Sequence, residues 1–259
     1  STYANKTKNW NINKDEIQVS YEVVALYPSV PIKKAISTIL DLLRADFDDV
    51  KTRTKFTLKH IKALIELCME NSYFLWNNKI YKLINSGPIG LSLMVVIAEG
   101  YLQVIEKKAI QIAMAFPQPV APISHHRYVD DTHDRFRTKA ESEQFLEILN
   151  AQGPCIQFTS EYENETKQLN FLDCTIINTG EGRYETKIFR KGAITNVQIK
   201  GNSHHDDNIK NGVFKVFLHR ARAVCTEKYL EEEIKFLIDV FVENGYERNT
   251  SERLAKLPS

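Results

Sequence analysis

The sequence predicts an α+β fold, with an antiparallel sheet backed by helices first and a mostly helical part after it. Short stretches rich in β-branched and aromatic residues alternate with amphipathic stretches up to about residue 180. Turn signals between neighbouring strands, such as Asn77-Asn78, favour hairpins and therefore antiparallel pairing. After Asn208 the hydrophobic periodicity becomes helical. We therefore expect two parts, residues 1–180 and residues 181–259.

Each expected element follows from its local pattern. Stretches that are apolar, or that alternate between apolar and polar residues, predict strands at 17–27, 74–76, 79–82, 156–161, 171–177 and 184–190. The same patterns predict a hairpin at 126–136 with its turn near Asp130-Asp131. Helical spacing predicts helices at 33–43, 92–113, 141–150, 209–225 and 227–243, and one that begins after the N-cap Thr57. Residues 46–49 are expected to form a loop, and Gly245 is expected to follow the last helix.

Composition and charge narrow the class of protein. Of the 259 residues, 43% are hydrophobic and 26% are charged, which is the balance of a globular chain. The net charge is +1, so a nucleic-acid surface must come from local clustering of basic residues. The four cysteines form no CxxC pair, which argues against a zinc site or a disulfide framework. The longest apolar stretch, residues 91–98, is too short to span a bilayer, so no membrane partner is expected.

Two adjacent carboxylates, Asp130 and Asp131, lie between strand-forming residues. Adjacent carboxylates repel each other, and a bound divalent cation offsets that cost. A third acidic residue, Glu22, lies on the first strand, and pairing within one sheet can bring it opposite the Asp pair. Such a cluster can hold two Mg²⁺ ions about 4 Å apart for in-line phosphoryl transfer. The alternative is a polar turn without a ligand, which Asp favours by itself.

The neighbouring motifs resemble those of reverse transcriptases. Residues 128–131 (YVDD) resemble the YxDD signature, and residues 21–27 (YEVVALY) resemble the metal-binding strand that precedes it. Residues 87–92 (GPIGLS), which open an apolar helix, resemble the turn that contacts template and nucleotide. Residues 169–173 (LNFLD) resemble the primer-grip region. The four motifs occur in the order that the family shows.

The resemblance implies a right-hand polymerase, with a palm and partial fingers over residues 1–180 and a helical, thumb-like region over residues 181–259. It implies RNA-directed DNA synthesis on an RNA or DNA template with a primer and a dNTP. Two Mg²⁺ ions, or Mn²⁺ in their place, would be held by Glu22, Asp130 and Asp131. Nucleotide-binding residues are implied at Tyr27, Gly87, Gly90, Ser92 and Tyr128, and primer-holding residues at Leu169, Phe171 and Leu172. The Tyr27 ring is implied as the gate that excludes a ribose 2′-hydroxyl.

Within the family, the chain is most similar to Penelope-like retroelements. Their members carry stretches similar to residues 19–31, 189–191, 202–205 and 219–221. The resemblance covers about residues 3–246, and it implies an intracellular, nuclear location. The oligomeric state is left open.

Some positions depart from the family pattern. The first metal ligand is usually Asp, and Glu22 is one methylene longer, which displaces its carboxylate by about a bond length. Only 21 residues precede Glu22, so most of the fingers region is expected to be missing. His133 and Asp134 stand where relatives usually have apolar residues. A second hypothesis therefore stays open, a catalytically inactive descendant that binds nucleic acid or protein.

Basic residues concentrate after position 186. A thumb-like helix along a duplex would use them for phosphate contacts, and the alternative is a solvated helix face. Lys215 and Arg222 are seven residues apart and can share one face of a helix. Contacts to the nucleic-acid backbone are expected from Arg190, Lys191, Lys215, Arg220 and Arg222.

Two other groups of residues bear on binding. The histidine pairs at 125–126 and 204–205 have neither helical i,i+4 spacing nor nearby cysteines, so metal binding by them is not favoured. The aromatic residues Phe74, Trp76 and Tyr81 could stack on bases. Packing in the core of their hairpin is the favoured interpretation.

Overall fold

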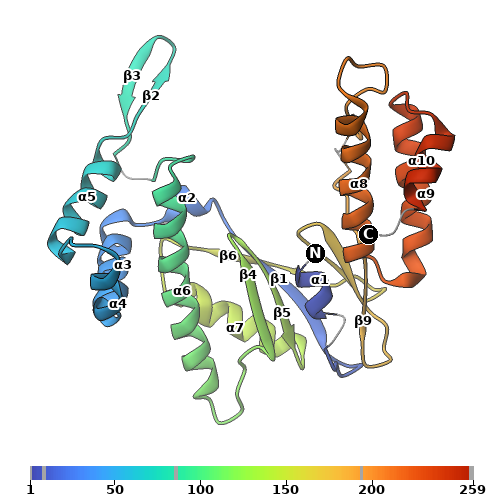
Figure 1. Ribbon diagram of the computed structural model, residues 1–259. Helices are drawn as coiled ribbons and strands as arrows, with labels where there is room; N and C mark the ends of the chain where they lie inside the picture. The colour runs from blue at the N-terminus through green and yellow to red at the C-terminus, as the bar shows by residue number, and fades with distance from the viewer. Residues whose placement is uncertain (1, 8–9, 85–86, 193–194, 257–259) are drawn as a thin grey trace. The chain divides into compact units, whose positions relative to one another are not determined.

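A computed structural model describes the chain except residues 1, 8–9, 85–86, 193–194 and 257–259 (Figure 1). The chain divides into two compact units. The sheet unit comprises Val19–Glu161, and the terminal unit comprises Ser1–Gln18 together with Tyr162–Ser259. The boundary expected near residue 180 falls inside the terminal unit, and the division into palm and thumb stays a prediction.

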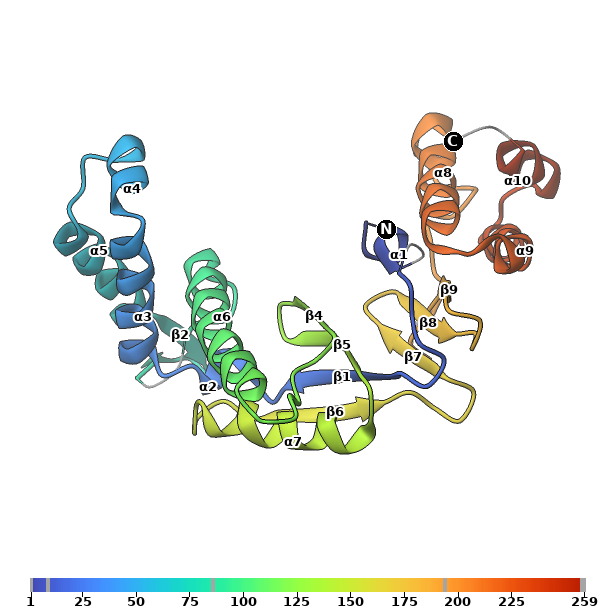
Figure 2. The same cartoon turned by 90° about the horizontal axis from the view of Figure 1, so that it is seen from below.

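The sheet unit is built on a sheet with the strand order β4-β5-β1-β6. The strands are β1 (Ile17–Val23), β4 (Ser124–Tyr128), β5 (Asp131–Phe136) and β6 (Phe158–Tyr162). Helices α6 (Ser92–Met114) and α7 (Lys139–Ala151) pack against each other, and α7 runs along the sheet (Figure 2). The fully buried ring of Tyr21 contacts Phe136 and Phe145, and its hydroxyl donates to the Ser142 carbonyl at 2.8 Å. These contacts fix β1 against α7.

The segment between β1 and α6 forms a helical layer and a projecting hairpin (Figure 1). Its elements are α2 (Leu26–Ser29), α3 (Ile32–Ala45), α4 (Phe47–Arg53), α5 (Leu58–Glu70), β2 (Tyr73–Trp76) and β3 (Lys79–Lys82). Helix α3 packs against both α5 and α6. The hairpin turn has left-handed φ angles of 48° at Asn77 and 58° at Asn78, as a type I′ turn requires.

The terminal unit combines a small sheet with helices. Its elements are α1 (Thr2–Thr7), the antiparallel strands β7 (Gln168–Phe171), β8 (Cys174–Asn178) and β9 (Tyr184–Ile188), and helices α8 (Asp207–Val224), α9 (Glu227–Glu243) and α10 (Arg248–Ala255). The three C-terminal helices share a core that contains Phe214, Leu218 and Phe241. In the described part of either unit, no helix is long and apolar enough to cross a membrane.

Several local signals are confirmed by the structure. Thr57 caps α5 by accepting from the His60 backbone N–H, and the Asn77-Asn78 turn joins β2 to β3. Helix α9 has the expected bounds, and Gly245 has a φ of 87° just after its C-cap. These signals act over a few residues, so they are legible without tertiary information.

Other expected bounds are wrong, each for a local reason. The first strand ends at Val23 and not at Tyr27, because Ala25 takes a left-handed φ of 48° and α2 follows. Residues 46–49 do not form a loop, since α4 begins at Phe47 with Asp48 and Asp49 in its first turn, where the helix dipole favours acidic residues. The stretch 171–177 is not one strand, because the chain turns at Leu172, which has a φ of 56°.

Truncation of Phe241 tests the helical core. Its ring is buried and meets Phe214 and Tyr246 edge-on, each at a centroid distance of 4.9 Å. We expect Phe241→Ala to lower the free energy of unfolding by about 3–5 kcal/mol, because it leaves a cavity. Chemical denaturation measures this change. Val216→Ala, at a position 66% exposed on α8, is the matched control and should change stability by about 0.5 kcal/mol or less.

Candidate active site

The YVDD hairpin brings the adjacent carboxylates beside β1. Tyr128 pairs with Asp131, so the two-residue turn is Val129-Asp130, one residue earlier than expected. Val129 occupies the left-handed region with a φ of 58°, which is strained for a β-branched residue. The Val23 backbone N–H donates to the Asp130 carbonyl at 3.1 Å. This bond places the end of β1 directly beside the turn that carries the Asp pair.

Strand alternation assigns the acidic side chains to faces of the sheet. Tyr21 faces α7, so Glu22, its neighbour along β1, points to the opposite face and is exposed. Asp134 on β5 faces α6 through its pairing with His125, so Asp131 points to the face away from α6. Glu22 and Asp131 thus share the face of the sheet that α6 and α7 do not cover. Asp130 lies in the turn at its edge.

The arginine of the hairpin is held by a buried ion-pair network. Arg127 Nε donates to Glu106 at 2.5 Å, and its Nη1 donates to Glu99 at 2.6 Å and to the Val129 carbonyl at 3.0 Å. The side chains of Arg127 and Glu106 are 6% and 8% exposed, whereas Glu99 is 53% exposed. Arg127 therefore anchors the strained turn residue to α6.

The network continues along the hairpin to β1. His125 Nδ1 lies 2.6 Å from the Asp134 carboxylate, and Thr132 Oγ1 donates to the other oxygen of Asp134 at 2.5 Å. The Tyr21 backbone N–H donates to the same Thr132 hydroxyl at 2.9 Å. Burial alone lowers the pKa of His125, but the carboxylates of Asp134 and Glu106 outweigh it and raise that pKa to about 10. His125 is therefore a cation at neutral pH.

The raised pKa of His125 predicts a pH-dependent stability. Its stabilising contribution is fully present below the unfolded-state pKa of about 6.5 and is lost as pH rises toward the folded-state pKa of about 10. We expect the free energy of unfolding to fall by up to about 1.4 kcal/mol for each pH unit within this window. Denaturant titrations from pH 6 to 9.5 measure the slope. His125→Gln should remove it, and an unchanged slope in that variant would contradict the assignment.

The expected nucleotide residues have clear structural roles. Gly90 has a φ of 97°, which favours glycine, and a Cβ on Gly87 would lie 1.9 Å from the Met94 sulfur. Ser92 is the first residue of α6, and Tyr27 lies half-buried on α2, which packs against α6. Tyr128 is exposed at the end of β4 (62%). Nucleotide binding by these five residues stays a prediction.

The expected primer-holding residues belong to the terminal unit. Leu169 and Phe171 are buried, and the Phe171 ring packs on Tyr3 at 4.8 Å between centroids. Leu172 is the turn residue between β7 and β8, and Arg220 of α8 pairs with the next residue, Asp173, at 2.6 Å. Primer holding by Leu169, Phe171 and Leu172 stays a prediction.

The expected backbone-contacting residues differ in what they bind within the chain. Arg190 forms a two-pronged ion pair with Glu233 and lies over the Phe236 ring at 4.2 Å. Arg222 is half-buried and donates to the Ala255 carbonyl at 2.8 Å. These two arginines have structural tasks.

The remaining three basic residues are exposed: Lys191, Lys215 and Arg220. Arg220 is also the residue that pairs with Asp173. Lys215 and Arg222 both lie on α8, where Lys215 is exposed and Arg222 is half-buried. Contact of the five basic residues with a nucleic-acid backbone stays a prediction.

The three carboxylates suit Mg²⁺ chemically but are not gathered around one point. Carboxylate oxygens are the ligands that Mg²⁺ takes from proteins. The backbone brings Glu22 and the Asp pair to neighbouring strands. Among the described residues, no three His, Cys, Asp or Glu side chains lie close enough together to hold a metal ion. Metal binding by Glu22, Asp130 and Asp131 stays a prediction.

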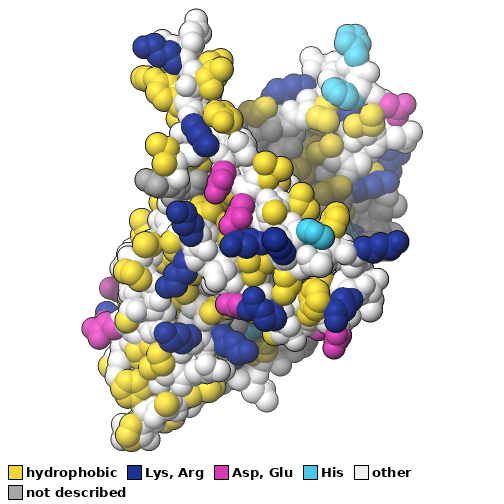
Figure 3. Space-filling view, turned by 90° about the vertical axis from the view of Figure 1, so that its left-hand side faces the viewer, with side chains coloured by type: hydrophobic (Ala, Val, Ile, Leu, Met, Phe, Trp, Pro, Cys, Tyr) yellow, Lys and Arg dark blue, Asp and Glu magenta, His cyan; other side chains and the backbone are white. Residues whose placement is uncertain are grey.

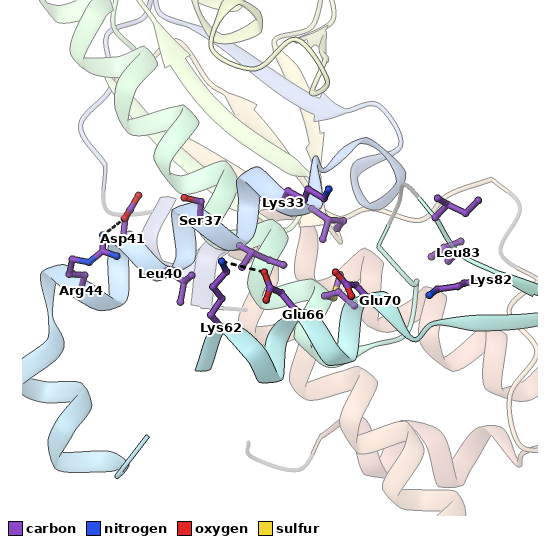
Figure 4. Close-up of a pocket in the computed structure, with 14 residues that line it drawn as sticks. Lys33, Ser37, Leu40, Asp41, Arg44, Lys62, Glu66, Glu70, Lys82 and Leu83 are labelled. Carbon is purple, nitrogen blue, oxygen red and sulfur yellow. Dashed lines mark hydrogen bonds and ion pairs between the residues drawn. The ribbon is translucent and has the colours of Figure 1, made fainter. Parts of the chain in front are cut away.

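A groove of about 840 Å³ lies elsewhere in the sheet unit, between α3, α5 and the end of β3 (Figure 4). Ile36, Leu40 and Met69 give it an apolar side. Ion pairs between Arg44 and Asp41 and between Lys62 and Glu66 lie on its polar side. The described residues that line it include none of the site residues expected from the sequence.

Arg127 and Glu106 were not among the site residues predicted from the sequence. The sequence indicates these two residues only through the spacing of polar residues in two separate elements. Glu99 and Glu106 are seven residues apart in a largely apolar helix, so they share one face. His125 and Arg127 alternate along β4 and therefore also share a face. Recognising the network required knowing that these two faces meet.

Solved structures of telomerase share this fold. The chain matches apo telomerase from Candida tropicalis with a TM-score of 0.55 and 11% identity, over 98% of this chain and 44% of the other. The same enzyme in complex with a TWJ fragment of telomeric RNA matches with a TM-score of 0.52 and 11% identity, over 100% and 42% of the chains. Telomerase from Candida albicans with the TWJ fragment matches with a TM-score of 0.50 and 12% identity, over 98% and 48%. This chain thus spans less than half the length of these telomerase chains.

The structural match establishes the class of fold. The chain has a reverse-transcriptase-like α+β polymerase fold with an antiparallel sheet backed by helices, as the sequence predicted. Residues 198–255, which contain α8, α9 and α10, match the family model described as an animal helix-turn-helix domain. No curated protein is significantly similar to this chain in sequence. The similarity to Penelope-like retroelements stays a prediction.

Proposed function

We propose that the chain is the polymerase core of a reverse transcriptase that carries out RNA-directed DNA synthesis. The observation that carries the proposal is the position of the Asp130-Asp131 pair. It lies on a hairpin beside Glu22 in a reverse-transcriptase-like fold. The particular lineage we propose is the Penelope-like retroelements, and the proposed location is the nucleus.

Each group of residues has a proposed task. Glu22, Asp130 and Asp131 would hold two Mg²⁺ ions, which when bound activate the attacking 3′-hydroxyl and stabilise the leaving pyrophosphate. The Arg127 network would keep the turn in place while the substrates exchange. Tyr27 would exclude nucleotides with a 2′-hydroxyl.

The proposed partners are a template–primer and a dNTP. The solved telomerase complexes that share the fold contain telomeric RNA, which supports a nucleic-acid partner. The helix-turn-helix match over residues 198–255 supports duplex contact by the terminal unit. Lys191 and Lys215 are exposed basic residues that could contact phosphates there.

Primer extension tests the proposal. Purified chain is incubated with a primer annealed to an RNA or DNA template, dNTPs, and Mg²⁺ or Mn²⁺. We expect metal-dependent extension, and we expect Glu22→Asp to extend at least as fast, because it restores the shorter carboxylate typical of the family. Absence of extension by both the natural chain and Glu22→Asp would contradict the proposal.

A second function is favoured by two specific observations. Glu22 replaces the usual Asp, and the described carboxylates do not form a ready three-ligand cluster. The alternative is a catalytically inactive descendant that binds nucleic acid or protein. Salt-dependent duplex binding without extension, unchanged by Glu22→Asp, would support this alternative.

A further inference from the structure

The hairpin β2–β3 is an exposed apolar projection of the sheet unit. All of its strand residues are exposed. Figure 1 shows the hairpin standing out beyond α5, and Figure 3 shows hydrophobic and lysine side chains together on this projection. The expectation that its aromatic rings would be buried in a hairpin core is therefore wrong. Exposed apolar surface that is concentrated in one place commonly marks a binding site.

The strand register sorts the aromatic rings onto one face. Phe74 pairs with Tyr81, and Trp76 pairs with Lys79, so these four side chains lie on the same side. The Phe74 and Tyr81 rings are stacked, with centroids 5.4 Å apart and planes at 16°. The Trp76 ring lies 6.2 Å from Tyr81 and is 65% exposed. These three rings and Lys79 form the aromatic face of the hairpin.

The opposite face of the hairpin is more aliphatic. It carries the pair Leu75 and Ile80, which are 70% and 76% exposed, and the pair Tyr73 and Lys82. The Lys82 ammonium lies 6.0 Å from the centre of the Tyr73 ring. The two faces therefore differ in chemistry although they belong to the same small element.

The charge of this segment favours a polyanion. The sequence has no Asp or Glu between Glu70 and Glu99, and the hairpin carries Lys79 and Lys82. A protein partner would be expected to bury the aliphatic face, and its affinity would not depend on the absence of carboxylates. Aromatic rings with interspersed lysines are the surface that binds single-stranded nucleic acid, since bases stack on rings and phosphates meet ammonium groups.

We propose that the aromatic face binds single-stranded nucleic acid, with bases stacked on Trp76 and on the Phe74–Tyr81 pair. Lys79 contacts the phosphates of the same strand. The Asn77-Asn78 turn sets the register of both strands, and the Phe74 and Tyr81 rings are already stacked without a ligand, so they are preorganised for binding. The proposal deepens the proposed function, because it rests on that function for the source of the strand, an unpaired template.

Tryptophan fluorescence tests the stacking directly. The chain has two tryptophans, Trp10 and Trp76, so the variant Trp10→Phe leaves Trp76 as the sole reporter. We expect oligo(dT) and oligo(U) to quench the fluorescence of this variant and a blunt duplex to quench it much less. Equal quenching by the blunt duplex, or none by the single strands, would overturn the proposal.

A second experiment does not need the Trp10 substitution. The fluorescence anisotropy of a labelled oligo(dT) measures its binding to variants of the natural chain. We expect Trp76→Ala to weaken binding about 10-fold to 100-fold, the range for loss of one stacked base. Leu75→Ala, on the other face of the same hairpin, is the matched control and should leave affinity unchanged. Equal affinities for Trp76→Ala and the natural chain would overturn the proposal. So would self-association of the protein that Trp76→Ala abolishes and with which oligo(dT) does not compete.

The outcomes separate this inference from the proposed function. Quenching of Trp76 fluorescence without primer extension would support the binding site and contradict the polymerase function. Full primer extension by Trp76→Ala, together with no quenching of Trp76 fluorescence, would support the polymerase function and contradict the binding site.

Discussion

Replacing Arg127 by methionine is expected to lower the free energy of unfolding by about 3–5 kcal/mol. Methionine fills much of the same volume but leaves Glu106, which is 8% exposed, without the guanidinium that lies 2.5 Å from it. The protonated His125 lies 3.6 Å from Glu106 and compensates only in part. The variant also loses the bond to the Val129 carbonyl, so the strained turn is released from α6.

Glu99→Gln is the matched control for Arg127→Met. Glu99 pairs with the same guanidinium but is 53% exposed, so water compensates for most of the lost ion pair with Arg127. We expect a change of about 1 kcal/mol or less in the free energy of unfolding. Denaturant unfolding of both variants at neutral pH gives the comparison. Equal losses for the two, or a negligible loss for Arg127→Met, would show that the buried network does not hold the hairpin.

Asp130→Asn is expected to reduce the rate of primer extension by about 100-fold or more, because metal ligation supplies several kcal/mol of transition-state stabilisation. Asparagine keeps the size of the side chain but removes its charge. The Asp130 backbone carbonyl, which accepts from Val23, is unchanged, so β1 stays paired with the turn. The change therefore addresses the carboxylate and not the fold.

Asp48→Asn controls for the loss of one negative charge. Asp48 lies on α4 with a fully exposed side chain, so its replacement should leave extension unchanged. Rates are compared at saturating primer–template and dNTP. If Asp130→Asn extends as fast as Asp48→Asn, Asp130 has no part in the chemistry.

Much of the fold was predictable because its signals are local. The Thr57 cap, the Asn77-Asn78 turn and the Gly/Pro turn that opens the apolar helix α6 each act within a few residues. Where prediction failed, a single backbone angle decided the outcome. Ala25 and Leu172 take left-handed φ values that neither residue favours, and these end one strand and split another.

The site was predictable only in part. The YVDD motif located the hairpin, and pairing in one sheet placed Glu22 beside it. The network behind the hairpin depends on α6 meeting β4, since Glu106 and Arg127 are 21 residues apart. The sequence shows His125 and Asp134 only as unusual polar residues, because their ion pair is a tertiary contact. For the same reason the exposure of Trp76 could not be read from the alternation of its hairpin.

Manganese binding tests the central claim, that Glu22, Asp130 and Asp131 form the metal site of a polymerase. The chain is first bound to a primer–template and a dNTP, with a primer that ends in a 3′-deoxy sugar so that it cannot be extended. Mn²⁺ is then added, and the free Mn²⁺ is measured by electron paramagnetic resonance. We predict two bound ions for the natural chain and for Asp48→Asn, and fewer for Asp130→Asn. The same number of bound ions in Asp130→Asn as in the natural chain would contradict the account.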